Sequence, residues 1–119
     1  MAMKIIAVAV FLLSGVCHAQ EPYHPSMASM IGYEAQMADM CGISSAPLEA
    51  AARRWVERAL DANARWNFIT QISEGRMIRA YSKETLDCSN ARKMVDHYEN
   101  LFRTARTPAE LAERYRTGR

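Results

Sequence analysis

Apolar residues recur at three- and four-residue spacing through most of the chain, a pattern that predicts amphipathic helices. The clearest period follows Ser44, Ser45 and Pro47, since serine caps a helix and proline suits its first turn. Charged residues fill the polar face of this segment. Its apolar face carries Leu48, Ala51, Ala52, Trp55, Val56, Ala59 and Leu60.

An earlier helix is predicted from Ser26 to Cys41, where Gly42 ends it. At 100° per residue, an apolar stripe centred on Met30 includes Met27, Met37 and Cys41, with Tyr33 and Met40 at its edge. This stripe predicts that Cys41 lies on the buried side of the helix.

Three further segments continue the helical pattern. The segment 65–81 is apolar over a wider arc, which predicts packing on more than one side, and Gly75 marks a close approach or a kink. After a connector at 82–88, a helix is predicted over 89–105, and a capping box opens a short helix at Thr107. The arc of 65–81 carries Trp66, Phe68, Ile69, Ile72, Met77, Ile78 and Tyr81; the face of 89–105 carries Ala91, Met94, Val95, Tyr98, Leu101, Phe102 and Ala105.

The N-terminus has the pattern of a secretory signal peptide. One positive charge at Lys4 precedes nine apolar residues, and small residues follow up to Ala19. The apolar run is shorter than the roughly 20 residues of a membrane-spanning helix. We therefore expect cleavage after Ala19, an extended Pro-rich leader at 20–26, and one helical domain at 27–119 without a transmembrane segment. Acylation of Cys17 is the alternative, but Val16 is a poor residue before a lipidated cysteine.

The expected mature chain is almost neutral. Lys4 is the only charged residue within 1–19, so 14 basic residues face 13 acidic ones. A nucleic-acid-binding domain usually carries a strongly basic patch, and none is expected here. The arginines near the C-terminus alternate with Glu110 and Glu113, as on a solvated helix face.

Cys41 and Cys88 are the only cysteines that remain after cleavage. In an exported chain of this size two cysteines most simply form one disulfide. Zinc-like ligand spacing and a Cys-x-x-Cys redox motif are both missing. The fold prediction is therefore all-α, a small four- to five-helix bundle closed by one disulfide.

No reactive constellation stands out. The mature chain offers His24 in the leader and His97 beside Asp96, and neighbouring helix positions point about 100° apart. Glu34 falls within the apolar stripe of the first helix, where it needs a basic partner such as Arg76 or Arg79, or else marks a rim or contact surface. We expect no enzyme activity and no cofactor.

A soft-metal site is the one metal hypothesis. Thioethers suit Cu(I) in an exported protein, although methionine is also a common filler of helical cores. Core packing is the favoured interpretation of these residues. The candidate ligands are His24, Met27, Met30, Met37 and Met40.

The order of leader, Cys41-Gly42, central Trp55, aromatic helix and Cys88 resembles a family of small, uncharacterised exported bacterial helical proteins with two cysteines. That resemblance implies a fold and no activity. The layout is also similar to periplasmic acid-stress chaperones of the HdeA type and, in architecture alone, to helical periplasmic immunity proteins.

The function predicted from these features is binding of another macromolecule, without catalysis, in the periplasm or outside the cell. The expected partner is a periplasmic or envelope protein, and nucleic acid is not expected. A stress chaperone of the HdeA kind and a Cu(I)-binding protein are the alternatives. Aromatic residues suit contact surfaces. The candidate contact residues are Glu34, Trp55, Trp66 and Tyr81.

Overall fold

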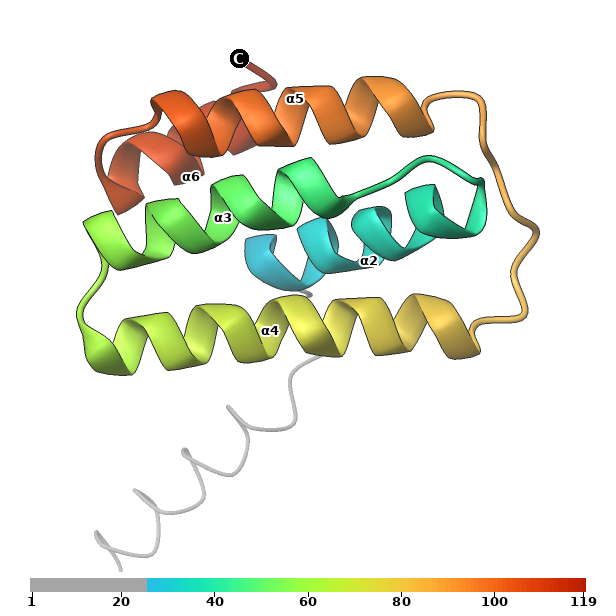
Figure 1. The fold of residues 1–119 in the computed structure, drawn as a ribbon, viewed down its shortest axis with the longest axis horizontal. Helices are drawn as coiled ribbons and strands as arrows, with labels where there is room; N and C mark the ends of the chain where they lie inside the picture. Colours follow the sequence, from blue (N-terminus) through green and yellow to red (C-terminus); the bar gives the residue numbers. More distant parts are fainter. Residues whose placement is uncertain (1–25) are drawn as a thin grey trace, which may run out of the picture.

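The computed structural model describes residues 26–119, so the predicted signal peptide 1–19, His24 and the leader up to Pro25 lie outside the described residues. The described part contains helices and no strand, and one disulfide closes it, which confirms the predicted fold class (Figure 1). The helices are α2 (Met27–Met40), α3 (Ala46–Ala59), α4 (Ala62–Tyr81), α5 (Ala91–Thr104) and α6 (Pro108–Thr117).

The helix starts follow local capping chemistry. The side chain of Thr107 accepts a hydrogen bond from the Glu110 backbone N–H at 3.1 Å, as the capping box predicts. Asp61 caps α4 in the same way, accepting from the Ala64 N–H at 2.9 Å. This cap starts α4 three residues before the predicted position, because an aspartate can satisfy the first free N–H groups of a helix.

The helices pack mainly in two pairs. α2 lies along α4, and α3 lies along α5, while α6 folds back beside α5 (Figure 1). The core forms where the pairs meet: the Trp55 ring lies 5.4 Å from Phe68 and 5.8 Å from Phe102, between ring centroids. The Trp55 indole N–H also donates to the carbonyl of Ala105 at 3.1 Å, at the end of α5. Trp55 therefore anchors α3 to α5 by both packing and a hydrogen bond.

The α2–α4 crossing depends on two glycines. A methyl group added at Gly75 would overlap the backbone of Ser29, and one added at Gly32 would overlap the carbonyl of Ile72. The predicted close approach at Gly75 is confirmed. Both overlaps involve backbone atoms, so neither position has room for a side chain.

The buried face of α2 differs from the predicted methionine stripe. Met27, Met30 and Met37 are only half-buried, and Met40 is 42% exposed. The prediction holds for Met27, which packs against the core, and was wrong for the other three methionines. Close packing against α4 selects small residues, whereas the sequence pattern selects the most apolar ones. The buried residues of α2 are Ala28, Ser29, Ile31, Gly32, Ala35 and Ala38.

The disulfide joins Cys41, at the C-terminal end of α2, to Cys88 in the connector before α5, with an S–S distance of 2.10 Å and a Cα–Cα distance of 5.6 Å. The predicted pairing is confirmed. Cys41 is half-buried and packs against the core, as its predicted place on the buried side of α2 requires, whereas Cys88 is exposed. The bond therefore holds the chain at the surface of the bundle.

Candidate functional site

Two adjoining features of α4 form the candidate site. The first is the side of the helix turned away from α2, which we call the α4 outer face. It is uncharged along its whole length, and its large members are well exposed: Trp66 by 72%, Met77 by 58% and Tyr81 by 81%. From Trp66 to Tyr81 the face runs about 22 Å along the helix. Its residues are Trp66, Thr70, Ser73, Met77, Ala80 and Tyr81.

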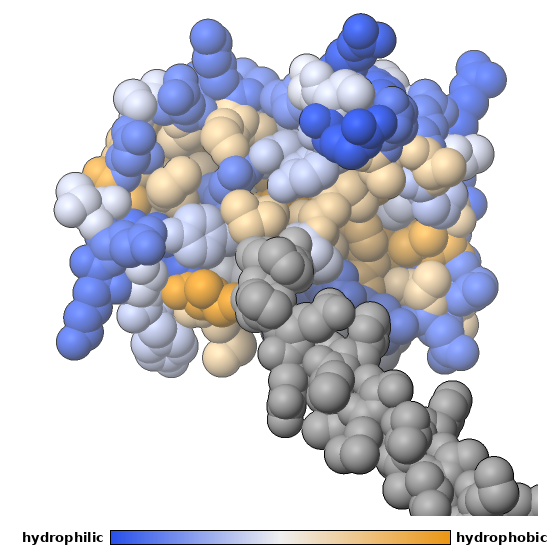
Figure 2. Space-filling view, turned by 180° about the vertical axis from the view of Figure 1, so that it is seen from behind, coloured by the Kyte–Doolittle hydropathy of each residue, from blue (hydrophilic) through white to orange (hydrophobic). Residues whose placement is uncertain are grey.

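The exposure of this face limits the prediction that 65–81 packs on more than one side, which holds for Phe68, in contact with Trp55 of α3 and Phe102 of α5. α4 is covered by α2 and contacts α3 only sparsely, so part of its apolar arc faces solvent. Ile78, beside the outer face, is also 47% exposed. In the view from behind, apolar side chains reach the surface at several places between hydrophilic ones, which project around the edge of the molecule (Figure 2).

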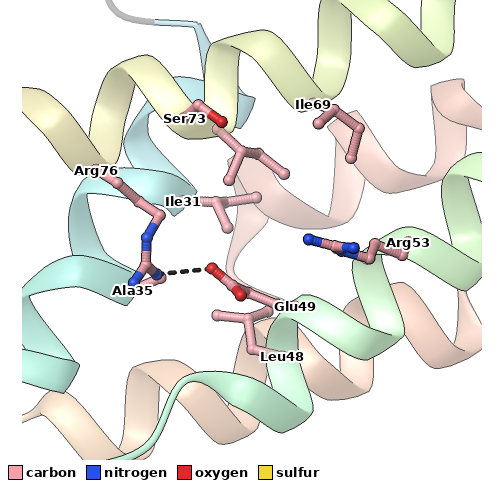
Figure 3. A pocket seen from close by; sticks show the side chains of 10 residues that line it. Ile31, Ala35, Leu48, Glu49, Arg53, Ile69, Ser73 and Arg76 are labelled. Carbon is pink, nitrogen blue, oxygen red and sulfur yellow. Dashed lines mark ion pairs between the residues drawn. The ribbon is translucent and has the colours of Figure 1, made fainter.

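The second feature is a groove between α3 and α4, which we call the α3/α4 groove. Ile31 and Ala35 of α2 form its floor, and a cavity of about 70 Å³ lies over them, lined mainly by apolar side chains with charged ones beside them (Figure 3). It exists because α3 and α4 are joined by a short connection yet contact each other little. The residues around it are Ile31, Ala35, Leu48, Glu49, Ala52, Arg53, Ile69, Ile72, Ser73 and Arg76.

Arg76 closes one end of the groove and joins three helices. Its guanidinium pairs with Asp39 of α2 at 2.6 Å and with Glu49 of α3 at 2.8 Å. Asp39 also accepts from the backbone N–H and the hydroxyl of Ser45 at 2.8 and 2.9 Å. Burial raises the pKa of Asp39, but the hydrogen bonds from Arg76 and Ser45 outweigh it and leave the pKa below its usual value.

Arg53 extends from α3 towards the middle of the groove (Figure 3). It differs from its neighbours Arg65 and Arg76, whose guanidinium groups are engaged. Arg65 donates to the carbonyls of Leu60 and Glu57 at 2.8 and 2.9 Å, where it caps the end of α3. Arg53 makes no hydrogen bond or ion pair with any residue in the described range.

Glu34 does not meet either predicted arginine. It faces Tyr98 of α5, whose hydroxyl donates to it, and Tyr98 stacks on Tyr115 of α6 with ring centroids 5.9 Å apart. Burial raises the pKa of Glu34, and the hydrogen bond from Tyr98 opposes this rise only in part. Burial, followed by the Glu34 carboxylate, raises the pKa of Tyr115 as well. Of the two alternatives for Glu34, the arginine partner is excluded, because Arg76 pairs with Asp39 and Glu49 and Arg79 contacts Tyr33 and Glu84.

Arg79 instead secures the connector after α4. Its side chain is 1% exposed, lies 5.8 Å above the Tyr33 ring, and donates to the carbonyl of Glu84 at 3.3 Å. Tyr33 in turn donates to the Glu84 carboxylate at 3.1 Å. Within residues 26–119, the Arg79 Nε and Nη1 atoms have no hydrogen-bond partner.

The four predicted contact residues separate into three environments. Trp55 is 1% exposed and belongs to the core, so its side chain presents no surface to a partner. Glu34 is half-buried beneath Tyr98. Trp66 and Tyr81 share the α4 outer face. Met77 and Arg53 were not among the predicted contact residues; the lack of charge along one side of 66–81 was the signal for Met77.

The structure describes only some of the residues proposed to bind Cu(I). His24 lies outside the described residues, and Met27 packs against the core. Between residues 26 and 119, no group of three or more His, Cys, Asp or Glu side chains is placed to hold a metal ion. Cu(I) binding through the thioethers of Met30, Met37 and Met40 stays a prediction.

No described helix combines the length and the hydropathy needed to cross a membrane. Comparison with known proteins returned no match, whether with protein-family models, with curated proteins or with solved structures.

Proposed function

We propose that this protein is an exported, non-catalytic helical domain that binds another protein through the α4 outer face. The observation that carries the proposal is the exposure of Trp66, Met77 and Tyr81 on one uncharged side of one helix. Tryptophan, tyrosine and methionine are enriched at protein interfaces, whereas scattered single apolar residues are the norm elsewhere on a surface.

The face is large enough to matter energetically. Trp66 and Tyr81 are each more than two-thirds exposed. Covering two aromatic side chains of this kind removes on the order of 300 Å² from water, which is worth about 7 kcal/mol before the cost of association. A partner that covers the face along its length would gain its main apolar contacts at the two ends.

The chemistry of the face favours a protein partner. Nucleic acids bind chiefly through cations on their phosphates, and the α4 outer face supplies uncharged side chains. The Cys41–Cys88 disulfide supports a compartment that oxidises thiols, and the pattern of residues 1–19 supports export. A periplasmic or envelope protein is therefore the proposed partner.

Site-specific photo-cross-linking tests the proposal. A photoreactive amino acid placed at position 66, 77 or 81 should capture the same partner in intact cells. The matched controls are Arg92 and Asn100, which are exposed polar positions on α5. The double variant Trp66→Ser, Tyr81→Ser should keep its thermal stability and lose the partner. Equal capture from α5, or an unchanged affinity of the double variant, would contradict the proposal.

A stress chaperone of the HdeA kind is the second candidate. It is favoured by the Asp39–Arg76–Glu49 network, because protonation of Asp39 in acid would weaken a contact shared by three helices. Acid should then loosen the bundle and expose apolar surface. Binding of a hydrophobic dye that stays flat between neutral pH and about pH 2.5 would reject this candidate.

A further inference from the structure

We propose that the α3/α4 groove receives one branched aliphatic side chain of the partner, with a carboxylate of the same partner segment placed on Arg53. This inference rests on the proposed function and names the chemistry of the partner. Ser73 belongs both to the α4 outer face and to the groove, so one bound polypeptide would cover both.

The volume of the cavity sets the size of the group. The cavity measures about 70 Å³. Enclosed cavities that hold a benzene ring measure roughly 150 Å³, so this one is too small to enclose an aromatic side chain. Most of its lining is apolar, including the side chains of Leu48, Ala52, Ile69 and Ile72, while Glu49, Arg53, Ser73 and Arg76 supply the polar part. A valine, leucine or isoleucine side chain matches both the volume and the apolar lining.

The charged residues at the opening of the groove indicate which group of the partner lies next to the aliphatic side chain. Arg76 is neutralised by Asp39 and Glu49, so it is not available to a ligand without breaking existing ion pairs. Glu49 and Glu57 each lie one helical turn from Arg53, and neither pairs with it. A carboxylate from outside would therefore meet a guanidinium that no residue of 26–119 pairs with, next to a mainly apolar cavity.

The groove continues along the helices beyond this cavity. A second, more open hollow of about 330 Å³ is lined by Arg53, Val56, Glu57, Arg65 and Ile69. Arg53 and Ile69 line both hollows. An extended segment lying along α3 would thus keep its acidic residue beside Arg53 while its aliphatic neighbour enters the cavity.

Methyl NMR of the oxidised protein tests the site with isocaproate as the probe, since it combines an isobutyl group and a carboxylate. The methyl signals of Ile31, Ile69 and Ile72 should shift with a dissociation constant of about 1–10 mM, the range for so small a ligand. Ile43 and Ile78 lie outside the groove and serve as internal controls. Isohexyl alcohol should bind more weakly because it has no charge to place on Arg53. Phenylacetate should bind more weakly because its ring is too large for the cavity.

Two matched variants measure the contribution of the Arg53 charge to binding. Arg53→Gln should weaken isocaproate binding about three- to fivefold, as expected for one partly solvated charged contact. Arg54→Gln, an exposed neighbour on α3 that lies outside the groove, should leave it unchanged. Equal binding of acid and alcohol, an equal effect of the two variants, or no saturable shift of the three isoleucines would overturn the inference.

A titration with a short peptide tests whether the group bound in the groove belongs to a polypeptide. A capped Gly-Asp-Leu-Gly peptide should shift the same methyl groups, and its Gly-Asn-Leu-Gly counterpart should do so less. Binding of isocaproate without binding of the peptide would overturn the inference. If the cellular partner is captured at positions 66 and 81 but Arg53→Gln does not weaken it, the proposed function stands and this inference fails.

Discussion

The guanidinium of Arg76, on α4, lies 2.6 Å from the carboxylate of Asp39, which is two residues before Cys41 and one residue before the end of α2. The same guanidinium reaches Glu49 on α3 at 2.8 Å, so three helices meet at one side chain. The contact is partly solvated, with about a quarter of the Arg76 side chain and a third of the Asp39 side chain exposed. It orders the end of the groove that holds the proposed binding site.

Asp39→Asn should lower the free energy of unfolding by about 1–2 kcal/mol at neutral pH, because it removes a charged acceptor from Arg76 and Ser45. Folding lowers the pKa of Asp39, so its contribution is present above the unfolded value near pH 3.9 and is lost as the pH falls through the folded pKa. Urea unfolding at neutral pH and at about pH 3 measures this. A variant that is destabilised equally at both pH values would refute the assignment.

Gly75→Ala should destabilise the protein by more than about 2 kcal/mol. Helix propensity alone favours alanine by about 1 kcal/mol, but the added methyl group would overlap the backbone of Ser29. The matched control is Ser73→Ala on the exposed side of the same helix, which should be neutral or slightly stabilising. Thermal and urea unfolding compare the two; equal stability of both variants would rule out the close approach.

Glu34→Gln should stabilise the protein at neutral pH by about 1 kcal/mol, because it removes a poorly solvated charge and keeps the side-chain shape. Folding raises the pKa of Glu34, so the protonated carboxyl group favours the folded protein. This contribution is complete below the unfolded value near pH 4.3 and is lost as the pH rises through the folded pKa. The gain should therefore vanish in acid, opposite to the behaviour of Asp39→Asn. Urea midpoints of the variant and the wild-type protein, measured from acid to neutral pH, show whether the substitution stabilises the protein.

Cys41→Ser combined with Cys88→Ser should cost about 4 kcal/mol, the chain-entropy value for a loop with a sequence separation of 47 residues. Stability of the wild-type protein in reductant should fall to the level of the double variant. An unchanged urea midpoint after reduction, with both thiols shown to be free, would mean that packing alone holds the bundle.

Local signals in the chain were enough to predict the helices and the covalent link. Capping residues such as Thr107, the regular period around Trp55 and the pairing of Cys41 with Cys88 depend on neighbouring positions or on simple counting. The start of α4 was missed because Asp61 acts as its cap, a role that depends on backbone geometry as well as residue type.

The exposed face and the groove were not predictable in the same way. Periodicity shows that residues 65–81 carry apolar groups on many sides, and it does not show which side a neighbour covers. The covered side is determined by close packing, because Gly32 and Gly75 let the backbones of α2 and α4 come into contact. As a result Trp66 and Tyr81 face solvent, and α3 contacts α4 only sparsely. The partners of Glu34 and Arg76 follow from the same packing. Hydrophobic spacing and caps are properties of neighbouring residues, so the chain specified its helices locally, whereas its binding surface arises only when the helices pack against one another.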